Sequence, residues 1–239
     1  MRAVPEALLT AAIVTGLVTV ASRFVPPHWI ASTVGGVFLL ATWVMVFRRD
    51  DSTVAHSGLA FSGLVLPAPL DARRIARDLA DALGWTFMLG VVCFAPFFVG
   101  FRLYARWVWH ALPVAWPPFH LGAALNEVVG QVALIALPEE VFYRGYLQTR
   151  LGDAWPSRVR VLGAPVGLSI LVTSAIFAIG HVLTIHDPGR LAVFFPSLVF
   201  GWLRQRTGGV GASVAFHATC NLFSATLLQA YGPHYSGAP

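Results

Sequence analysis

Three groups of ionisable or amide side chains lie inside or beside apolar runs, each with a four-residue spacing. The groups are Glu139, Glu140 and Arg144, then Phe177 and His181, then His217 and Asn221. Side chains four positions apart share a face of a helix, so each group predicts side chains that act together. Ionisable residues inside apolar segments are costly, and in membrane proteins they mark functional sites.

The residue types in these groups predict hydrolytic chemistry. A carboxylate with a histidine can activate water as a general base, and a second histidine with an asparagine can donate hydrogen bonds to a developing oxyanion. Glu140 and Arg144 share a face, and an arginine partner makes a buried carboxylate tolerable. Glu139 is rotated by about 100° from Glu140 on a helix and is left for chemistry. The set predicts a peptide-bond hydrolase without a covalent intermediate.

The same side chains leave a zinc site open as an alternative. Glu139, His181 and His217 could hold zinc with water in the fourth position. The chain lacks the His-Glu-x-x-His pattern of zinc proteases, and also the Gly-x-Ser-Gly and Gly-x-Gly-Asp patterns of other intramembrane proteases. Cys93 and Cys220 are expected to be buried free thiols.

Each group taken alone also has a packing explanation. A Glu–Arg pair at a helix end, a hydrogen-bonded histidine and an asparagine between helices are all common structural features. Three such groups on three apolar segments, each with helical spacing, are harder to explain by packing.

The composition of the chain indicates the class of protein that positions these side chains. The chain has 239 residues, of which 56% are hydrophobic and 11% are charged, and its mean hydropathy is +0.69. A soluble domain carries about 25% charged residues, so a soluble fold and a disordered chain are disfavoured. The net charge of +5 is spread between apolar runs. This distribution favours membrane orientation over binding to nucleic acid, and no nucleic-acid partner is expected.

The apolar segments predict an all-α, polytopic membrane helix bundle of about seven transmembrane helices, with six to eight allowed. They lie at 5–22, 28–47, 84–104, 119–149, 161–183, 190–203 and 210–231. The first segment could also be a signal peptide, but a retained helix is favoured because another span follows almost at once. No cofactor is expected.

The whole chain, 1–239, is predicted to be one integral-membrane domain. Residues 1–118 form N-terminal helices with an amphipathic connector at about 48–83, in which the segment 71–81 is expected to be a helix at the interface. Residues 119–231 form the core that carries the three groups, and 232–239 form a mobile tail.

The arginines predict an orientation for a multi-pass protein of the inner or cell membrane. With seven spans and a cytoplasmic N-terminus, eleven arginines fall inside and four outside, so the C-terminus is outside. The inside set is Arg2, Arg48, Arg49, Arg73, Arg74, Arg77, Arg150, Arg158, Arg160, Arg204 and Arg206, and the outside set is Arg23, Arg102, Arg106 and Arg190. This prediction fails if one weak span, such as 190–203, is miscounted.

The candidate residues lie at different distances along their helices from the arginines at the helix ends, so their depths in the membrane do not agree. Glu139 lies 11 residues from Arg150, about 16 Å along a helix. His217 lies at the same spacing from Arg206. His181 lies 21 residues from Arg160, about 31 Å. The fifth helix must therefore tilt, or begin later, near 163–165.

The three groups resemble the signature of the CPBP family, the CAAX-protease and bacteriocin-processing enzymes. That signature is Glu-Glu-x-x-x-Arg, Phe-x-x-x-His and His-x-x-x-Asn on successive membrane helices. Here it runs from Glu139 to Asn221 in the same order, and the resemblance covers about residues 120–231.

The resemblance implies a glutamic-type intramembrane endopeptidase that acts on a membrane-anchored protein or peptide. It implies that Glu139 and His181 activate water and that His217 and Asn221 stabilise the oxyanion. Glu140 and Arg144 would support the site, and Phe177 would pack in it or contact substrate. All 16 basic residues are arginine, which favours a bacterial member that removes a C-terminal anchor or sorting signal, or matures a peptide. Asn221 is a poor zinc ligand and a good oxyanion donor, which favours a mechanism without metal.

Two other classes compete with a protease. A non-catalytic scaffold or bacteriocin-immunity protein of the same fold would not need the complete residue set. A transporter could use buried charges for ion coupling, but the chain shows no internal repeat and its unusual charges lie in one half.

Overall fold

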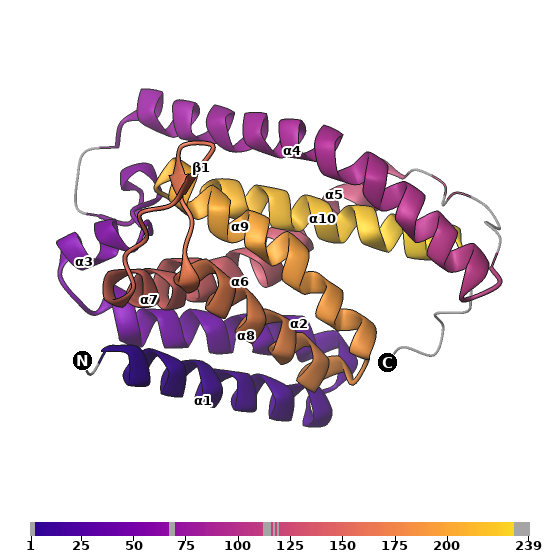
Figure 1. Cartoon of the computed structure of the whole chain (residues 1–239), viewed down its shortest axis with the longest axis horizontal. Coiled ribbons are helices and arrows are strands. Elements are labelled where there is room, and N and C mark those ends of the chain that lie inside the picture. The colour runs from indigo at the N-terminus through magenta and orange to yellow at the C-terminus, as the bar shows by residue number, and fades with distance from the viewer. Residues whose placement is uncertain (1–2, 67–69, 112–115, 117, 119, 232–239) are drawn as a thin grey trace.

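The chain folds as an all-α bundle in a computed structural model, which describes residues 3–66, 70–111, 116, 118 and 120–231 (Figure 1). The long helices are α1 (Ala3–Phe24), α2 (Pro27–Thr42), α4 (Ala72–Trp107), α8 (Leu168–Ile185), α9 (Phe194–Thr207) and α10 (Gly211–Ala230). A two-stranded hairpin, β1 (Arg160–Val161) and β2 (Ala164–Pro165), is the β structure of the described residues. The predicted mobile tail, 232–239, lies outside the described residues.

Among the described residues, five helical segments are long and apolar enough to cross a membrane, where about seven were predicted. They are Ala3–Phe24, Pro27–Phe47, Ala72–Trp107, Leu121–Ala154 and Leu168–Ile185. The predicted sixth span corresponds to α9, whose 14 residues make about 21 Å of helix, less than the hydrocarbon core of a bilayer. The seventh corresponds to α10, which has the length but is not one of the five. These findings support an integral membrane protein.

The connector at 48–83 is not separate from the third span. It contains α3 (Asp51–His56) and a 3-10 turn, η2 (Phe61–Gly63), and its amphipathic part is helical as predicted. That part, however, continues into the span as α4, a single helix of 36 residues. Asp71 caps its first turn by accepting hydrogen bonds from the backbone N–H groups of Arg73 and Arg74.

The fourth span is one helical run, Leu121–Ala154, interrupted twice by π-helical turns. Its parts are α5 (Leu121–Gly130), η3 (Gln131–Ala136), α6 (Leu137–Glu140), η4 (Val141–Gln148) and α7 (Thr149–Ala154), of which η3 and η4 are π-helical. Pro138 has no backbone N–H to donate, and a change in the hydrogen-bond ladder beside it accommodates that loss. π turns inside α-helices are frequent at functional sites.

The fifth span begins later than Arg160, which resolves the disagreement in depth. The β1–β2 hairpin occupies residues 160–165, and α8 starts at Leu168. His181 therefore lies 13 residues into α8, about 20 Å from its start, comparable to the depths predicted for Glu139 and His217. After α8, the 3-10 helix η5 (Pro188–Val193) leads into α9.

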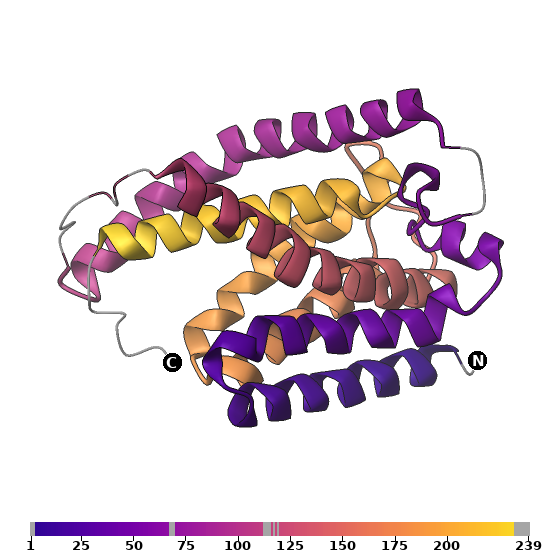
Figure 2. The same cartoon turned by 180° about the vertical axis from the view of Figure 1, so that it is seen from behind.

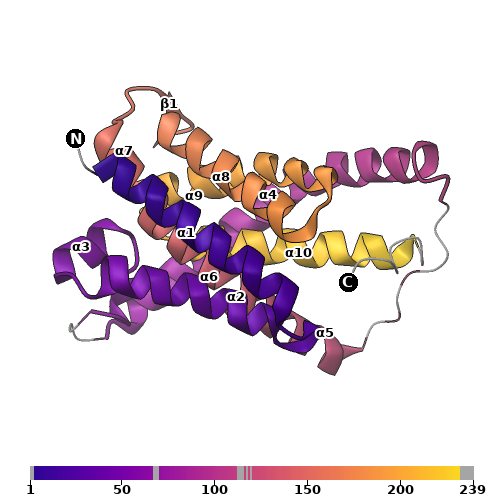
Figure 3. The same cartoon turned by 90° about the horizontal axis from the view of Figure 1, so that it is seen from below.

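The run Leu121–Ala154 passes through the middle of the bundle, between α2 and α10 (Figure 2). On one side α1 lies across α2 and against α7 and α8 (Figure 3), and on the other side α4 lies along α10. Gly35 on α2 permits a close approach to the central run, because a Cβ there would stand 2.6 Å from the backbone oxygen of Leu134.

Candidate active site

The first motif lies on the part of the central helix that is enclosed on all sides. Glu139 and Glu140 end α6, between the two π turns, and Arg144 lies one turn later in η4. Glu140 and Arg144 are completely buried, and Glu139 is 9% exposed. Buried charges need partners, so their surroundings determine what each group can do.

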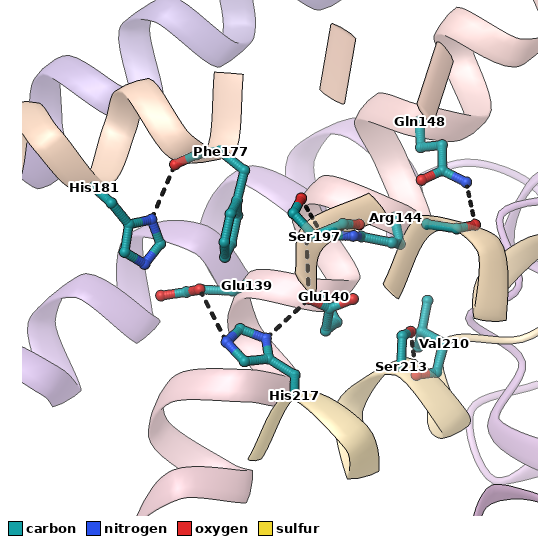
Figure 4. Close-up of polar contacts among 11 residues, drawn as sticks. Glu139, Glu140, Arg144, Gln148, Phe177, His181, Ser197, Val210, Ser213 and His217 are labelled. Carbon is teal, nitrogen blue, oxygen red and sulfur yellow. Dashed lines mark hydrogen bonds and ion pairs between the residues drawn. The ribbon is translucent and has the colours of Figure 1, made fainter. Parts of the chain in front are cut away.

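Glu140 interacts with both Arg144 and His217 and so joins the polar side chains of two helices (Figure 4). Its Oε1 lies 3.0 Å from Nη1 of Arg144, so the pairing predicted from their spacing is confirmed. The same oxygen accepts a hydrogen bond from Nδ1 of His217 at 2.9 Å. A carboxylate only accepts, so this contact fixes the proton on Nδ1 and turns Nε2 of His217 toward the rest of the site.

Glu139 lies beside this network without being bound into it. Its Oε2 is 3.8 Å from Nε2 of His217, longer than a hydrogen bond, and accepts no hydrogen bond from any described residue. Its carboxylate points toward the space between His181 and His217 (Figure 4). Glu139 can thus accept a proton or a hydrogen bond from a further molecule. Oε2 of Glu140 is also without a hydrogen-bond partner among the described residues, but Oε1 of Glu140 is held by Arg144 and His217.

His181 reaches the site from α8. Its Nδ1 donates to the backbone oxygen of Phe177 at 2.9 Å, which leaves Nε2 turned toward Glu139 (Figure 4). The Phe177 ring packs against both histidines, with centroid distances of 4.4 Å to His181 and 5.8 Å to His217. The three helices therefore bring the Glu, Phe and His members of the motifs into one cluster.

Asn221 stands at the edge of that cluster. It lies one turn beyond His217 on α10, and its amide nitrogen donates to Oε1 of Gln131 at 3.0 Å. This bond ties α10 to the π turn η3. One N–H of the amide is thereby engaged, and among the described residues Asn221 makes no hydrogen bond to Glu139, His181 or His217.

Several residues outside the motifs also belong to the site. Arg144 Nη2 donates to both the hydroxyl and the carbonyl oxygen of Ser197 on α9, at 2.6 and 3.1 Å. Gln148 donates to the carbonyl oxygen of Gly201 at 2.9 Å. In sequence Ser197 and Gly201 are small residues in an apolar run, which gives no signal for such contacts.

The zinc alternative stays a prediction, because a histidine whose Nδ1 donates to a protein oxygen has Nε2 free to bind either water or a metal. Among the described residues, no three His, Cys, Asp or Glu side chains are grouped as metal ligands. Nδ1 of His217 and Nδ1 of His181 are engaged by protein oxygens, and the two Nε2 atoms flank the Glu139 carboxylate. This arrangement suits a water molecule or a substrate oxygen that is hydrogen-bonded from several sides.

Residues 122–223 match the family model described as type II CAAX prenyl endopeptidase Rce1-like. The matched segment contains all three motifs and also α9. No curated protein and no solved structure matches the chain. Residues 122–223 therefore match this family, as the three motifs predicted.

Proposed function

We propose that the chain is a glutamic-type intramembrane endopeptidase in which Glu139 and His181 activate water for attack on a peptide bond. The Rce1-like family implies CAAX-type intramembrane endopeptidase activity in general. The observation that carries the finer proposal is the Glu139 carboxylate, which is buried, free of protein hydrogen bonds at Oε2 and flanked by two imidazole rings.

The reaction needs only water and these side chains. Glu139 accepts a proton from water while Nε2 of His181 helps to hold that water, and the resulting hydroxide attacks the carbonyl carbon. The tetrahedral intermediate then breaks at the carbon–nitrogen bond. The proton held by Glu139 passes to the leaving amine, so that an acid and an amine are released and the carboxylate is restored.

His217 is assigned to the oxyanion. Its ring lies between two carboxylates, with Nδ1 2.9 Å from Oε1 of Glu140 and Nε2 3.8 Å from Oε2 of Glu139. Nδ1–H bonds Glu140, and a proton carried on Nε2 would be donated to the developing oxyanion. Asn221 serves the same oxyanion with the amide N–H that Gln131 does not take.

The substrate is proposed to be a membrane-anchored protein or peptide that is cut near a C-terminal anchor or sorting signal in a bacterial membrane. Five apolar spans and a buried site support a substrate that reaches the enzyme through the bilayer. The family description points to a prenylated C-terminal peptide as the first probe. The second probe is an unprenylated peptide that ends in a transmembrane anchor.

The test is cleavage of both probes by the full-length protein in lipid vesicles, with products identified by mass spectrometry. Glu139→Ala and His181→Ala are expected to abolish cleavage and to cause an unprocessed membrane-anchored protein to accumulate in the host. Glu127→Ala, which changes an exposed acid on the same helical run, is the matched control and should cleave normally.

A strong chelator separates the proposal from the zinc alternative. Full activity after chelation supports the mechanism above, whereas loss of activity that zinc restores would replace it. Normal processing by both the Glu139 and the His181 variants would refute the catalytic assignment and favour a non-catalytic membrane protein.

A further inference from the structure

Helix α9 contacts the site although none of the three motifs lies on it. Two of its contacts to the central helix have the same sequence offset, 53 residues, from Arg144 to Ser197 and from Gln148 to Gly201. α9 is therefore packed parallel to η4 in a fixed register. A Cβ at Gly201 would stand 2.7 Å from Oε1 of Gln148, so this register depends on a glycine.

The register places Phe200 against the face of the His217 ring. The two rings are stacked, with centroids 4.6 Å apart and planes 17° apart. Phe200 is 2% exposed, and the Arg144 guanidinium lies over its ring at 5.2 Å. One side chain thus contacts both partners of Glu140.

Phe177 and Phe200 contact these two groups in different geometries. Phe177 meets the His217 ring edge-on, with planes 76° apart, while Phe200 lies nearly parallel to it. The Arg144 guanidinium lies 4.8 Å from the Phe177 ring and 5.2 Å from the Phe200 ring. A hydrogen bond to Glu140 fixes one atom of the imidazole, whereas a stacked ring fixes its plane. Both restraints are needed to aim Nε2 at Glu139.

We propose that Phe200 is a positioning residue that holds the His217 ring in the plane in which Nδ1 meets Glu140 and Nε2 faces Glu139. Phe200 does not need to touch the substrate, because its effect passes through His217. The effect of Phe200 on catalysis rests on the proposed function, whereas the placement of the His217 ring by Phe200 does not.

The test compares three substitutions in the full-length protein. Phe200→Met removes the ring but keeps an apolar side chain of similar reach, and Phe200→Tyr keeps the ring. Phe195→Met is the matched control, since Phe195 is on the same helix and 68% exposed. The readouts are kcat and KM on the cleaved probe peptide, and the ring-proton signals of His217 in histidine-labelled protein, assigned by their loss in His217→Gln.

The proposal predicts that Phe200→Met lowers kcat by about 10²-fold with little change in KM, because misplacement of a reacting group acts mainly on the chemical step. The His217 ring signals should move downfield as the stacked ring is lost. Phe200→Tyr should keep kcat and the His217 ring signals close to their wild-type values, and Phe195→Met should change neither quantity.

A folded Phe200→Met protein with wild-type kcat would overturn the proposal. If Phe200→Met does not fold, Phe200→Leu takes its place, and unmoved His217 signals in either variant also overturn it. If the wild-type chain cuts no probe, the proposed function fails, and the His217 signals alone then decide whether Phe200 sets the ring.

Discussion

The central helical run contains two regions with opposite surroundings. None of the ten described residues of α5 is buried, and Leu121, Leu125 and Val129 are more than half exposed. A few turns later all eight residues of η4 are buried, on every face of the helix. The first region presents apolar side chains outward, whereas the second holds Arg144 and follows directly on Glu139 and Glu140.

The difference shows where a membrane helix can hold charge. An apolar face needs no protein neighbour, because lipid tails are as apolar as leucine. Carboxylates and a guanidinium need partners on all sides, and α2, α8, α9 and α10 supply them around η4 and α6. The acid of the open region, Glu127, lies 12 residues before Glu139, about 18 Å along the helix and near its end, where charge meets the interface.

Arg144→Ala should give the largest loss of stability in the enclosed region. It leaves the Glu140 carboxylate buried with only His217 as a partner, and breaking a buried ion pair in this way costs about 3–5 kcal/mol. Arg150→Ala, on the same run but exposed, is the control and should cost little. Free energies of unfolding in mixed micelles measure both, and equal losses would remove the contrast between the two arginines.

Matched leucine substitutions test the same contrast without charge. Leu147 is completely buried and Leu125 is 56% exposed, both on the central run. Leu147→Ala should destabilise the protein by about 2–5 kcal/mol through the cavity it leaves. Leu125→Ala should change stability little, because lipid takes the place of the lost atoms. Thermal unfolding in lipid nanodiscs compares the two, and a larger effect at Leu125 would mean that α5 is covered by protein.

Alanine substitutions at two neighbouring glycines of α2 should give smaller changes in the free energy of unfolding, with opposite signs. A Cβ at Gly35 would meet the backbone oxygen of Leu134 at 2.6 Å, whereas a Cβ at Gly36 would meet nothing within 4 Å. Gly35→Ala should therefore cost about 1–3 kcal/mol by forcing α2 away from the central helix. Gly36→Ala should stabilise its helix by about 0.5–1 kcal/mol. The unfolding free energies of the two variants should move in opposite directions, and a shared sign would show that α2 does not approach η3 so closely.

Local spacing predicted the parts of the site that depend on one helix. Glu140 and Arg144 share a face because of the helical period, and the pair is present at 3.0 Å. The bond from His217 to Glu140 joins residues 77 positions apart, so spacing alone could not assign it. The same holds for the contacts of α9, since Ser197 and Phe200 look like ordinary members of an apolar run. Short-range patterns identify which residues do chemistry, whereas helix packing decides which atoms face each other.

For the fold as well, local sequence patterns predicted the helices but not how they continue into each other. Apolar runs identified the helices, but they could not show that the amphipathic segment continues into the third span, because both halves of α4 are compatible with helix. They could not show the two π turns either, which arise where Pro138 and the packed neighbours alter the backbone ladder. α9 was predicted as a span from composition alone, and its 14 residues are too few to cross the bilayer.

The most direct test of Glu139 as the general base is the single-turnover rate of peptide cleavage by two Glu→Gln variants of the central helix. Glu139→Gln removes the enclosed carboxylate and keeps its shape, and Glu127→Gln makes the same change in the open region. We expect Glu139→Gln to lower the rate by about 10²–10⁴-fold, the usual contribution of a general base, and Glu127→Gln to leave it unchanged. A folded Glu139→Gln protein that cuts at the wild-type rate would show that Glu139 is not the general base.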